Sequence, residues 1–288
     1  MFTPYNSGMS IRLGGPIFLK SDDPAELARE HKRLGYRAAY CPPLKAHQTD
    51  RIRAVRDAFA KEDVVIAEVG AWCNLQHPDT VEREKNIAHN IERLQLAEEV
   101  GARCCVNLVG SHNREHWFGP HPDNFKPEFF DAVVETTRRI LDAVNPKRTT
   151  YAIEMMQWQP PDSADSYLDL IRAIDRPALG AHFDPVNIIW SPRSYYNNGA
   201  LIREVIAKLG DRIVSAHAKD TTMNHEAVVT IRECRPGTGN LDYPAFLREL
   251  DRLPREIPLM LEHLPNAEEY DLAAAHVRTV AKSGAISL

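Results

Sequence analysis

Apolar runs and helical patterns alternate along the whole chain. The apolar runs cover residues 11–19, 37–41, 63–69, 103–109, 150–155, 179–183, 212–217 and 257–261. Between them, apolar residues recur at helical spacing over 24–34, 50–61, 79–100, 127–144, 164–174, 200–209, 244–253 and 267–281. The pattern predicts eight strand–helix units.

The predicted strands are continuous apolar runs, which indicates burial on both faces of a sheet. Strands that alternate with helices pair in parallel through right-handed crossovers. Eight such units close into a (β/α)8 barrel, the TIM barrel, so we expect residues 1–288 to form a single barrel domain. An open doubly wound sheet is the alternative, but neither Gly-rich phosphate-binding pattern typical of that fold occurs in the sequence.

Charge and composition narrow the class of protein. The 288 residues have a net charge of −5 and no block of basic residues, which disfavours a nucleic-acid partner. No apolar run approaches the roughly 18 residues of a membrane-spanning helix, and the N-terminal MFTPYNSGMS lacks the features of a secretory signal. The five cysteines form no CxxC pair. We expect a cytoplasmic protein without disulfides that has no nucleic-acid or membrane partner.

Four potential metal ligands follow the last four predicted strands. Active sites of (β/α)8 barrels lie at the carboxyl ends of the strands, and these ends carry Glu154, Asp184, His217 and Glu262. Three carboxylates and one imidazole suit Mn2+, Mg2+ or Co2+ better than a closed tetrahedral zinc site. Salt bridges at ordinary strand ends are the alternative. We expect one divalent ion, most readily Mn2+, with Mg2+, Co2+ or Zn2+ as alternatives.

These residues belong to short motifs that resemble a known family. The chain is similar over nearly its whole length to the xylose isomerase-like barrel superfamily, in its sugar phosphate isomerase/epimerase branch. The resemblance implies that the three acids and the histidine bind one divalent metal, and that Glu154 and Glu262 also act as acid/base groups. The motifs are Glu154, the stretches Asp184-Pro185-x-Asn187 and His217-Ala218-Lys219-Asp220, the turn Arg235-Pro236-Gly237-Thr238-Gly239, and Glu262.

One position departs from the ketose epimerases of this superfamily. Those enzymes place a substrate-contacting histidine three residues after the strand-6 aspartate, where this chain has Asn187, and His182 lies two residues before that aspartate. We expect both Asn187 and His182 to contact substrate. The stretches IRLGGPIF and AAYCPP also resemble a subgroup similar to C-glycoside deglycosidases, which act on 3-keto sugars by enolisation and elimination.

A second group of polar residues follows predicted strand 4. The loop 110–126 is long for a strand-to-helix connection, and we interpret it as a lid or sugar-binding rim. In it, His112 is the candidate auxiliary acid/base. The remaining candidate substrate-binding residues are Asn107, His116, Trp117, Lys219 and Arg235, of which Lys219 alternatively orients His217.

The expected activity is proton abstraction next to the carbonyl of a keto sugar. A divalent cation stabilises the enediolate that develops, and a glutamate within reach removes the proton. Return of the proton gives isomerisation or epimerisation. The alternative is a lyase that eliminates a β-substituent from a 3-keto sugar or inosose. Less favoured are a metal-dependent endonuclease for damaged DNA and a non-catalytic sugar-binding barrel. The expected partners are a small keto sugar or glycoside, further copies of the chain, and alternatively a small partner subunit.

Overall fold

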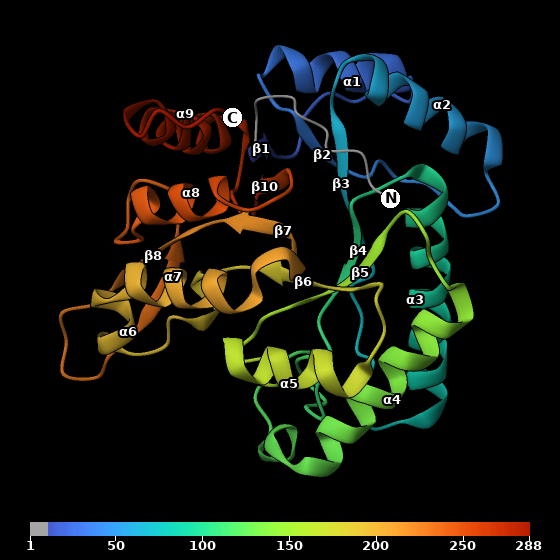
Figure 1. Ribbon diagram of the computed structural model, residues 1–288, viewed down its shortest axis with the longest axis vertical. Helices are drawn as coiled ribbons and strands as arrows, with labels where there is room; N and C mark the ends of the chain where they lie inside the picture. The colour runs from blue at the N-terminus through green and yellow to red at the C-terminus, as the bar shows by residue number, and fades with distance from the viewer. Residues whose placement is uncertain (1–10) are drawn as a thin grey trace.

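Eight parallel strands form a closed barrel at the centre of the molecule (Figure 1). The computed structural model describes residues 11–288. β1 pairs with β2 on one side and with β10 on the other, which closes the sheet and confirms the predicted (β/α)8 architecture. The barrel strands are β1 (Ile11–Gly14), β2 (Ala38–Tyr40), β3 (Val65–Gly70), β4 (Cys104–Asn107), β5 (Thr150–Glu154), β6 (Leu179–Phe183), β7 (Ile213–Ala218) and β10 (Ile257–Leu261).

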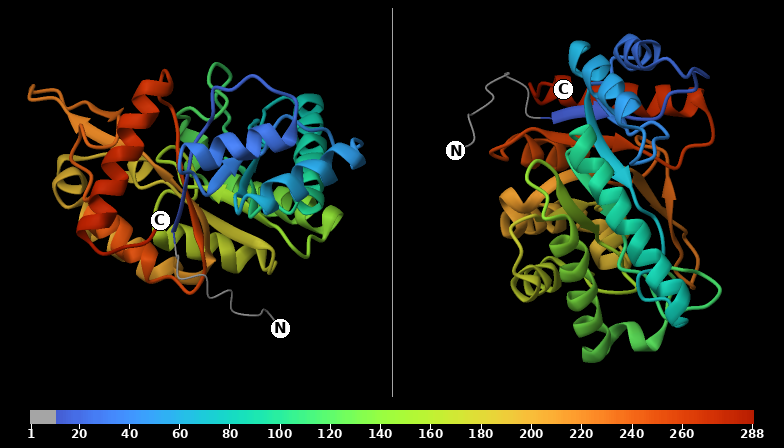
Figure 2. Two further views of the ribbon diagram at one scale, coloured as in Figure 1. Left: turned by 90° about the horizontal axis from the view of Figure 1, so that it is seen from above. Right: turned by 90° about the vertical axis from the view of Figure 1, so that its right-hand side faces the viewer.

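Helices connect the strands and surround the barrel (Figure 2). The longest, α3, begins after Asp79, whose side chain accepts a hydrogen bond from the backbone of Glu82, and it ends at Gly101 in a left-handed conformation. Among residues 11–288, no helix combines the length and apolar character needed to cross a membrane. The surrounding helices are α1 (Pro24–Arg33), α2 (Thr49–Lys61), α3 (Thr80–Val100), α4 (Pro127–Val144), α5 (Ala164–Ile174), α7 (Asn198–Leu209), α8 (Tyr243–Asp251) and α9 (Ala267–Ser283).

The core has an outer layer and a smaller interior. Along β4, Cys105 belongs to the large cluster between strands and helices, whereas Cys104 and Val106 belong to a small separate cluster. Because successive strand residues point to opposite faces, the small cluster lies inside the barrel. A second small cluster contains Ala38 and Ala67. Such small side chains leave room inside the barrel for polar groups.

Some structural elements differ from the sequence-based expectation. The first strand ends at Gly14, so the predicted run to residue 19 is too long. The polar stretch after β7 forms an antiparallel hairpin of β8 (Asp220–Met223) and β9 (Ile231–Cys234). A short helix, α6 (Pro192–Tyr196), precedes α7. The hairpin projects from the body of the molecule (Figure 2).

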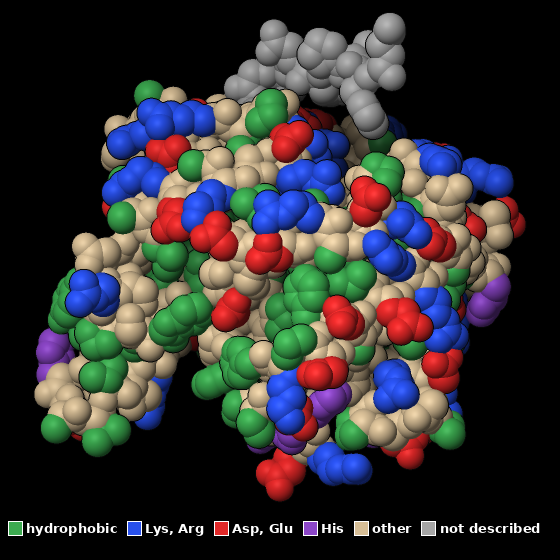
Figure 3. Space-filling model, turned by 60° about the horizontal axis from the view of Figure 1, so that its bottom comes forward, with side chains coloured by type: hydrophobic (Ala, Val, Ile, Leu, Met, Phe, Trp, Pro, Cys, Tyr) green, Lys and Arg blue, Asp and Glu red, His purple; other side chains and the backbone are tan. Residues whose placement is uncertain are grey.

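A deep hollow opens beside the hairpin. Figure 3 shows it at the lower left, between the lobe that contains α6 and the hairpin and the rest of the molecule, with hydrophobic side chains along its edges. Trp158 and Trp190, which follow β5 and β6, are 37% and 52% exposed. The loops after the strands therefore present aromatic surface to solvent.

We expect Tyr167→Phe to weaken the barrel without changing its topology. The buried Tyr167 hydroxyl lies 2.6 Å from the carbonyl oxygen of Ile153 on β5 and 2.8 Å from that of Gly180 on β6. Loss of this hydrogen bond should lower the free energy of unfolding by about 1–2 kcal/mol. Urea denaturation measures it, with Tyr196→Phe as the control because Tyr196 is 64% exposed. Equal stability of the two variants would contradict the prediction.

Candidate metal centre

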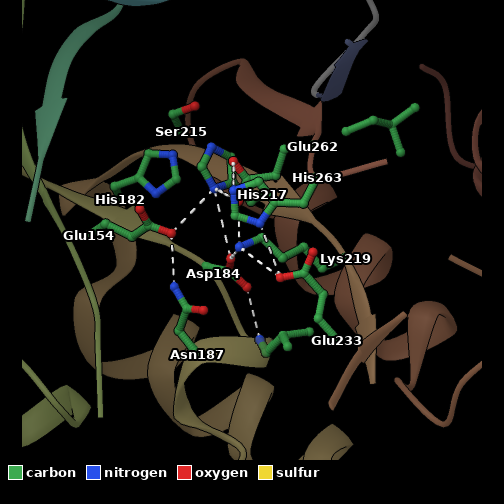
Figure 4. A network of polar contacts seen from close by, with 12 residues as sticks. Glu154, His182, Asp184, Asn187, Ser215, His217, Lys219, Glu233, Glu262 and His263 are labelled. Carbon is green, nitrogen blue, oxygen red and sulfur yellow. Dashed lines mark hydrogen bonds and ion pairs between the residues drawn. The ribbon is translucent and has the colours of Figure 1, made fainter. Parts of the chain in front are cut away.

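Four metal-ligating side chains meet at one end of the barrel (Figure 4). Glu154 is the last residue of β5, Asp184 directly follows β6, His217 lies near the end of β7, and Glu262 directly follows β10. These strands are consecutive neighbours in the barrel. One ligand atom from each residue lies within 4.8 Å of those of the other three. The structure thus brings together the four residues singled out as ligands.

The imidazole of His217 is central to this group. Its Nδ1 lies 3.3 Å from Glu154 Oε1, 2.9 Å from Glu262 Oε1 and 3.8 Å from Asp184 Oδ2. His217 Nδ1 and Asp184 Oδ2 are buried and make ion-pair contacts but no hydrogen bond of good geometry. Buried polar atoms normally have a partner, and a divalent cation would supply one to both atoms at once. The residues present therefore fit such an ion, with Glu154, Asp184, His217 and Glu262 as its ligands.

A buried lysine neutralises part of the negative charge. Lys219 Nζ lies 2.8 Å from Asp184 Oδ2, contacts Glu262 Oε1, and lies 3.4 Å from Glu233 Oε2. Burial alone would lower the pKa of Lys219, but the charges of Asp184 and Glu262 raise it well above its ordinary value. Burial opposes the ionisation of Glu262, yet His217 and Lys219 together lower its pKa to about 2. Lys219 is therefore a permanent cation at the edge of the four ligands.

Asn187 reaches the same group from the segment after β6. Its amide nitrogen donates a 2.9 Å hydrogen bond to Glu154 Oε1. This contact orients one carboxylate oxygen of Glu154, and Figure 4 shows both side chains on the same side of the cluster. Asn187 is half-buried beside a candidate metal ligand, and its expected contact with substrate stays a prediction.

Two other expected substrate contacts lie in the interior. Asn107 is fully buried and donates to Asn90 Oδ1 and to the carbonyl oxygen of Cys73. His182 is also fully buried, and its Nε2 lies 2.9 Å from Glu68 Oε1. The structure places both side chains among protein groups, with no exposed surface. The expectation that polar residues near strand ends lie in the active site did not separate side chains that face a substrate from side chains buried in the protein.

Glu68 on β3 was missed as a site residue by the sequence analysis. It accepts hydrogen bonds from His182, from Ser215 and from Nε2 of His217. Glu68, His182 and His217 also form a second close group of metal-ligating types. The one available signal was an acidic residue within the apolar run DVVIAEV, where an unpaired charge is costly to bury.

The loop after β4 forms its own local cluster. His112 packs edge-on against Phe129 and His121, and burial lowers its pKa. His116 is exposed, and Trp117 packs edge-on against Phe118. These candidate residues contact their own loop and α4 instead of the four ligands. Their expected roles toward a substrate stay predictions.

Comparison with known proteins identifies the family. A model of the family described as xylose isomerase-like TIM barrel matches residues 28–280. The chain belongs to this family. None of the curated proteins compared with the chain matches it.

Solved structures of xylose isomerase-like barrels share the fold at low identity. A family member from Mycobacterium smegmatis in complex with magnesium is 20% identical, with a TM-score of 0.65 over 90% of this chain and 87% of that one. D-Psicose 3-epimerase from Clostridium cellulolyticum H10, solved with D-tagatose, is 12% identical, with a TM-score of 0.68 over 97% and 100%. The probable 3-DHS dehydratase AsbF from Bacillus anthracis is 11% identical, with a TM-score of 0.66 over 94% and 98%.

The turn after β9 is organised by one aspartate of this xylose isomerase-like barrel. Asp220 Oδ1 accepts hydrogen bonds from the backbone N–H groups of Thr221 and Leu241, and its Oδ2 accepts from those of Gly237 and Gly239. A Cβ at Gly239 would lie 2.3 Å from Asp220 Oδ1, so only glycine allows this approach. Asp220 therefore holds the turn against the start of β8, directly after Lys219.

The same turn directs Arg235 away from the ligand cluster. Arg235 Nε lies 2.8 Å from Glu269 Oε2, at the start of α9. The guanidinium is half-buried in this ion pair. The structure therefore gives Arg235 a contact between the turn and α9, and its expected role as a substrate contact stays a prediction.

We expect Asp220→Asn to loosen the turn. An amide nitrogen in place of one carboxylate oxygen would face backbone N–H groups, so at least two of the four hydrogen bonds would be lost. The free energy of unfolding should fall by about 2–3 kcal/mol, with faster amide hydrogen exchange at residues 237–241. Asp211→Asn, at an exposed position, is the control. Unchanged exchange in the turn would refute the assigned role of Asp220.

Proposed function

We propose that this chain is a divalent-metal-dependent sugar isomerase or epimerase that removes a proton from the carbon next to a carbonyl of a keto sugar. The observation that supports the proposal most strongly is the position of the two glutamates. Glu154 and Glu262 come from β5 and β10, the outer strands of the four that carry the ligands. A substrate held at the open side of the cluster would have one carboxylate on either side.

The ion and the side chains have separate tasks in this proposal. A bound divalent cation would stabilise negative charge on the carbonyl oxygen and a neighbouring hydroxyl oxygen of the sugar. Glu154 or Glu262 accepts the proton from carbon, since both side chains lie at the cluster. Asn187 holds Glu154 in position through its 2.9 Å hydrogen bond. Lys219 supplies a fixed positive charge beside Asp184 and Glu262.

The paired carboxylates explain how two products arise from one proton abstraction. If one glutamate removes the proton and the other returns a proton to the opposite face of the same carbon, the sugar is epimerised. If the proton returns to the neighbouring carbon, an aldose and a ketose are interconverted. The epimerase among the solved structures, with D-tagatose, supports this class of substrate. The exposed Trp158 and Trp190 provide ring faces suited to the apolar CH groups of a sugar.

Elimination is the second candidate function, and Lys219 favours it. After the same proton abstraction, the electron pair forms a carbon–carbon double bond and a β-substituent leaves with a proton. The glutamate that accepted the proton could return it to the leaving group, and the Lys219 ammonium, in contact with Glu262, would stabilise negative charge that develops there. The probable dehydratase among the solved structures supports this alternative. Mn2+ is the ion that we propose, and an unphosphorylated keto sugar or glycoside is the proposed small-molecule partner.

The proposal predicts solvent-proton exchange that depends on the cluster. Incubated in D2O with Mn2+ and a panel of keto sugars, the wild-type protein should place deuterium at the carbon next to the carbonyl of its substrate. Glu154→Gln and Glu262→Gln should each lower this rate by about 10²–10⁴-fold, because each removes one proton acceptor. Mass spectrometry and NMR of the sugars measure both label and product. A new double bond would assign elimination, whereas a new epimer or an aldose would assign the first function.

Metal content provides an independent arm of this experiment. We expect one bound ion per wild-type chain after Mn2+ loading and gel filtration, and loss of that ion in His217→Ala. Glu84→Gln is the matched control, because Glu84 forms a surface ion pair with Arg139 away from the cluster. A folded wild-type protein with neither bound Mn2+ nor exchange into any sugar would overturn the proposal.

A further inference from the structure

One carboxylate inside the barrel is enclosed by three donors. Glu68 on β3 is 1% exposed. Its Oε1 lies 2.5 Å from Ser215 Oγ and 2.9 Å from His182 Nε2, and its Oε2 lies 3.3 Å from His217 Nε2. The proton-abstraction chemistry proposed above does not use this carboxylate, since protein groups surround it. A buried carboxylate is costly unless its interactions compensate, so its position calls for an explanation.

The two ring nitrogens of His217 face different partners. Nε2 faces Glu68, whereas Nδ1 faces the carboxylates of Glu154, Asp184 and Glu262. A neutral imidazole carries its single N–H on one nitrogen and a lone pair on the other. A carboxylate at Nε2 accepts the N–H there, which leaves the lone pair on Nδ1. Nδ1 is thereby the atom available to a metal ion.

Ser215 and His182 hold Glu68 in the orientation that this requires. Both donate to Oε1, so Oε2 is the oxygen left for His217. The strand register supports the arrangement. β6 and β7 slip by one residue between Ala181 and His182, which places His182 opposite Ser215. Such irregularities re-aim side chains, and here Ser215 and His182 meet on the same carboxylate.

We infer that Glu68 is a positioning residue that fixes the ring orientation and tautomer of His217, with Ser215 and His182 as its supports. The inference rests on the proposed metal-dependent function and adds a carboxylate–histidine pair to it. Partners of this kind raise the basicity of a metal-ligating histidine, and their removal typically costs about 10–100-fold in metal affinity. Glu68 acts through His217 and touches neither the ion nor the sugar.

The competing explanation is that Glu68 only satisfies polar groups in the barrel. Glu68→Gln separates the two, because it preserves the size of the side chain and removes its charge. If Glu68 only satisfies polar groups in the barrel, Glu68→Gln would lower the free energy of unfolding and leave the affinity for metal unchanged. As the partner of His217, glutamine offers an N–H to Nε2 in one orientation and a weaker acceptor in the other. Either orientation disfavours a lone pair at Nδ1.

Mn2+ affinity, measured by calorimetric titration of the full chain, tests the inference. We expect the dissociation constant for Mn2+ to rise about 10–100-fold in Glu68→Gln. Glu256→Gln is the matched control, because Glu256 is a buried carboxylate bound by Arg12 at 2.9 Å and Arg103 at 2.8 Å, outside this cluster. Its dissociation constant should stay within about twofold of the wild-type value, whatever its loss of stability.

Two further variants keep the test decisive if Glu68→Gln fails to fold. Ser215→Ala retains the carboxylate and removes one of its supports, so the dissociation constant for Mn2+ should rise by a smaller factor, about 3–10-fold. Glu68→Asp should recover part of the lost affinity. In the Zn2+-loaded protein, 15N NMR should show the proton of His217 on Nε2 in the wild type.

The outcomes distinguish this inference from the proposed function. Wild-type affinity in a folded Glu68→Gln or in Ser215→Ala, together with Mn2+-dependent exchange by the wild type, would overturn the role of Glu68 and leave the proposed function intact. A proton on Nδ1 of His217 in the Zn2+-loaded wild type would also overturn it. A wild-type chain that binds no Mn2+ would overturn both.

Discussion

The concentration of carboxylates at one end of the barrel is the constraint on which the rest of the site depends. Glu154, Asp184 and Glu262 would repel one another strongly in surroundings that exclude water. Before an ion binds, two cationic side chains on β7 or directly after it offset that repulsion, since the His217 imidazolium faces all three acids and Lys219 contacts two of them. Burial would lower the pKa of His217, yet the surrounding acids raise it well above its ordinary value.

The closed barrel makes this concentration of charge possible. Each acid lies at the end of a different barrel strand or directly after it, so the acids converge although they are far apart in sequence. The interior below them contains small residues such as Ala38, Ala67 and Ala152, which leaves space for Glu68 and the ring of His182. Apolar residues outside the barrel supply most of the packing. Stability and chemistry therefore occupy separate layers.

The sequence was sufficient for the fold and for choosing four side chains that the structure brings together, because both follow from local patterns. An apolar run followed directly by an acid or histidine marks a strand end. Because the four strands are neighbours in the barrel, these residues then lie close together. Glu68 lies inside such a run, and its partners come from β6 and β7, so the strand-end pattern does not select it. The sequence analysis expected Asn107 and His182 to contact substrate, and that expectation has a different origin. Their strands were identified, but no local pattern shows that Asn107 contacts Asn90 on α3 or that His182 contacts Glu68 inside the barrel.

The hairpin escaped prediction because its stabilising contacts are polar. Asn224 accepts a hydrogen bond from the backbone of Thr230 and donates one to the carbonyl oxygen of Val228, which joins the two ends of the connecting loop. Such contacts leave no period-two apolar signal. The residues of β8 and β9 therefore appeared to be an irregular loop.

Lys219 also affects the order in which the protein can be assembled. Its ammonium group is covalently part of the chain, so Asp184 and Glu262 have a cationic neighbour as soon as β7 joins the sheet. A site made of acids alone would have to wait for an ion before its strands could close. If the chain binds the proposed ion, the barrel could close before the ion arrives, so folding would not depend on the supply of metal.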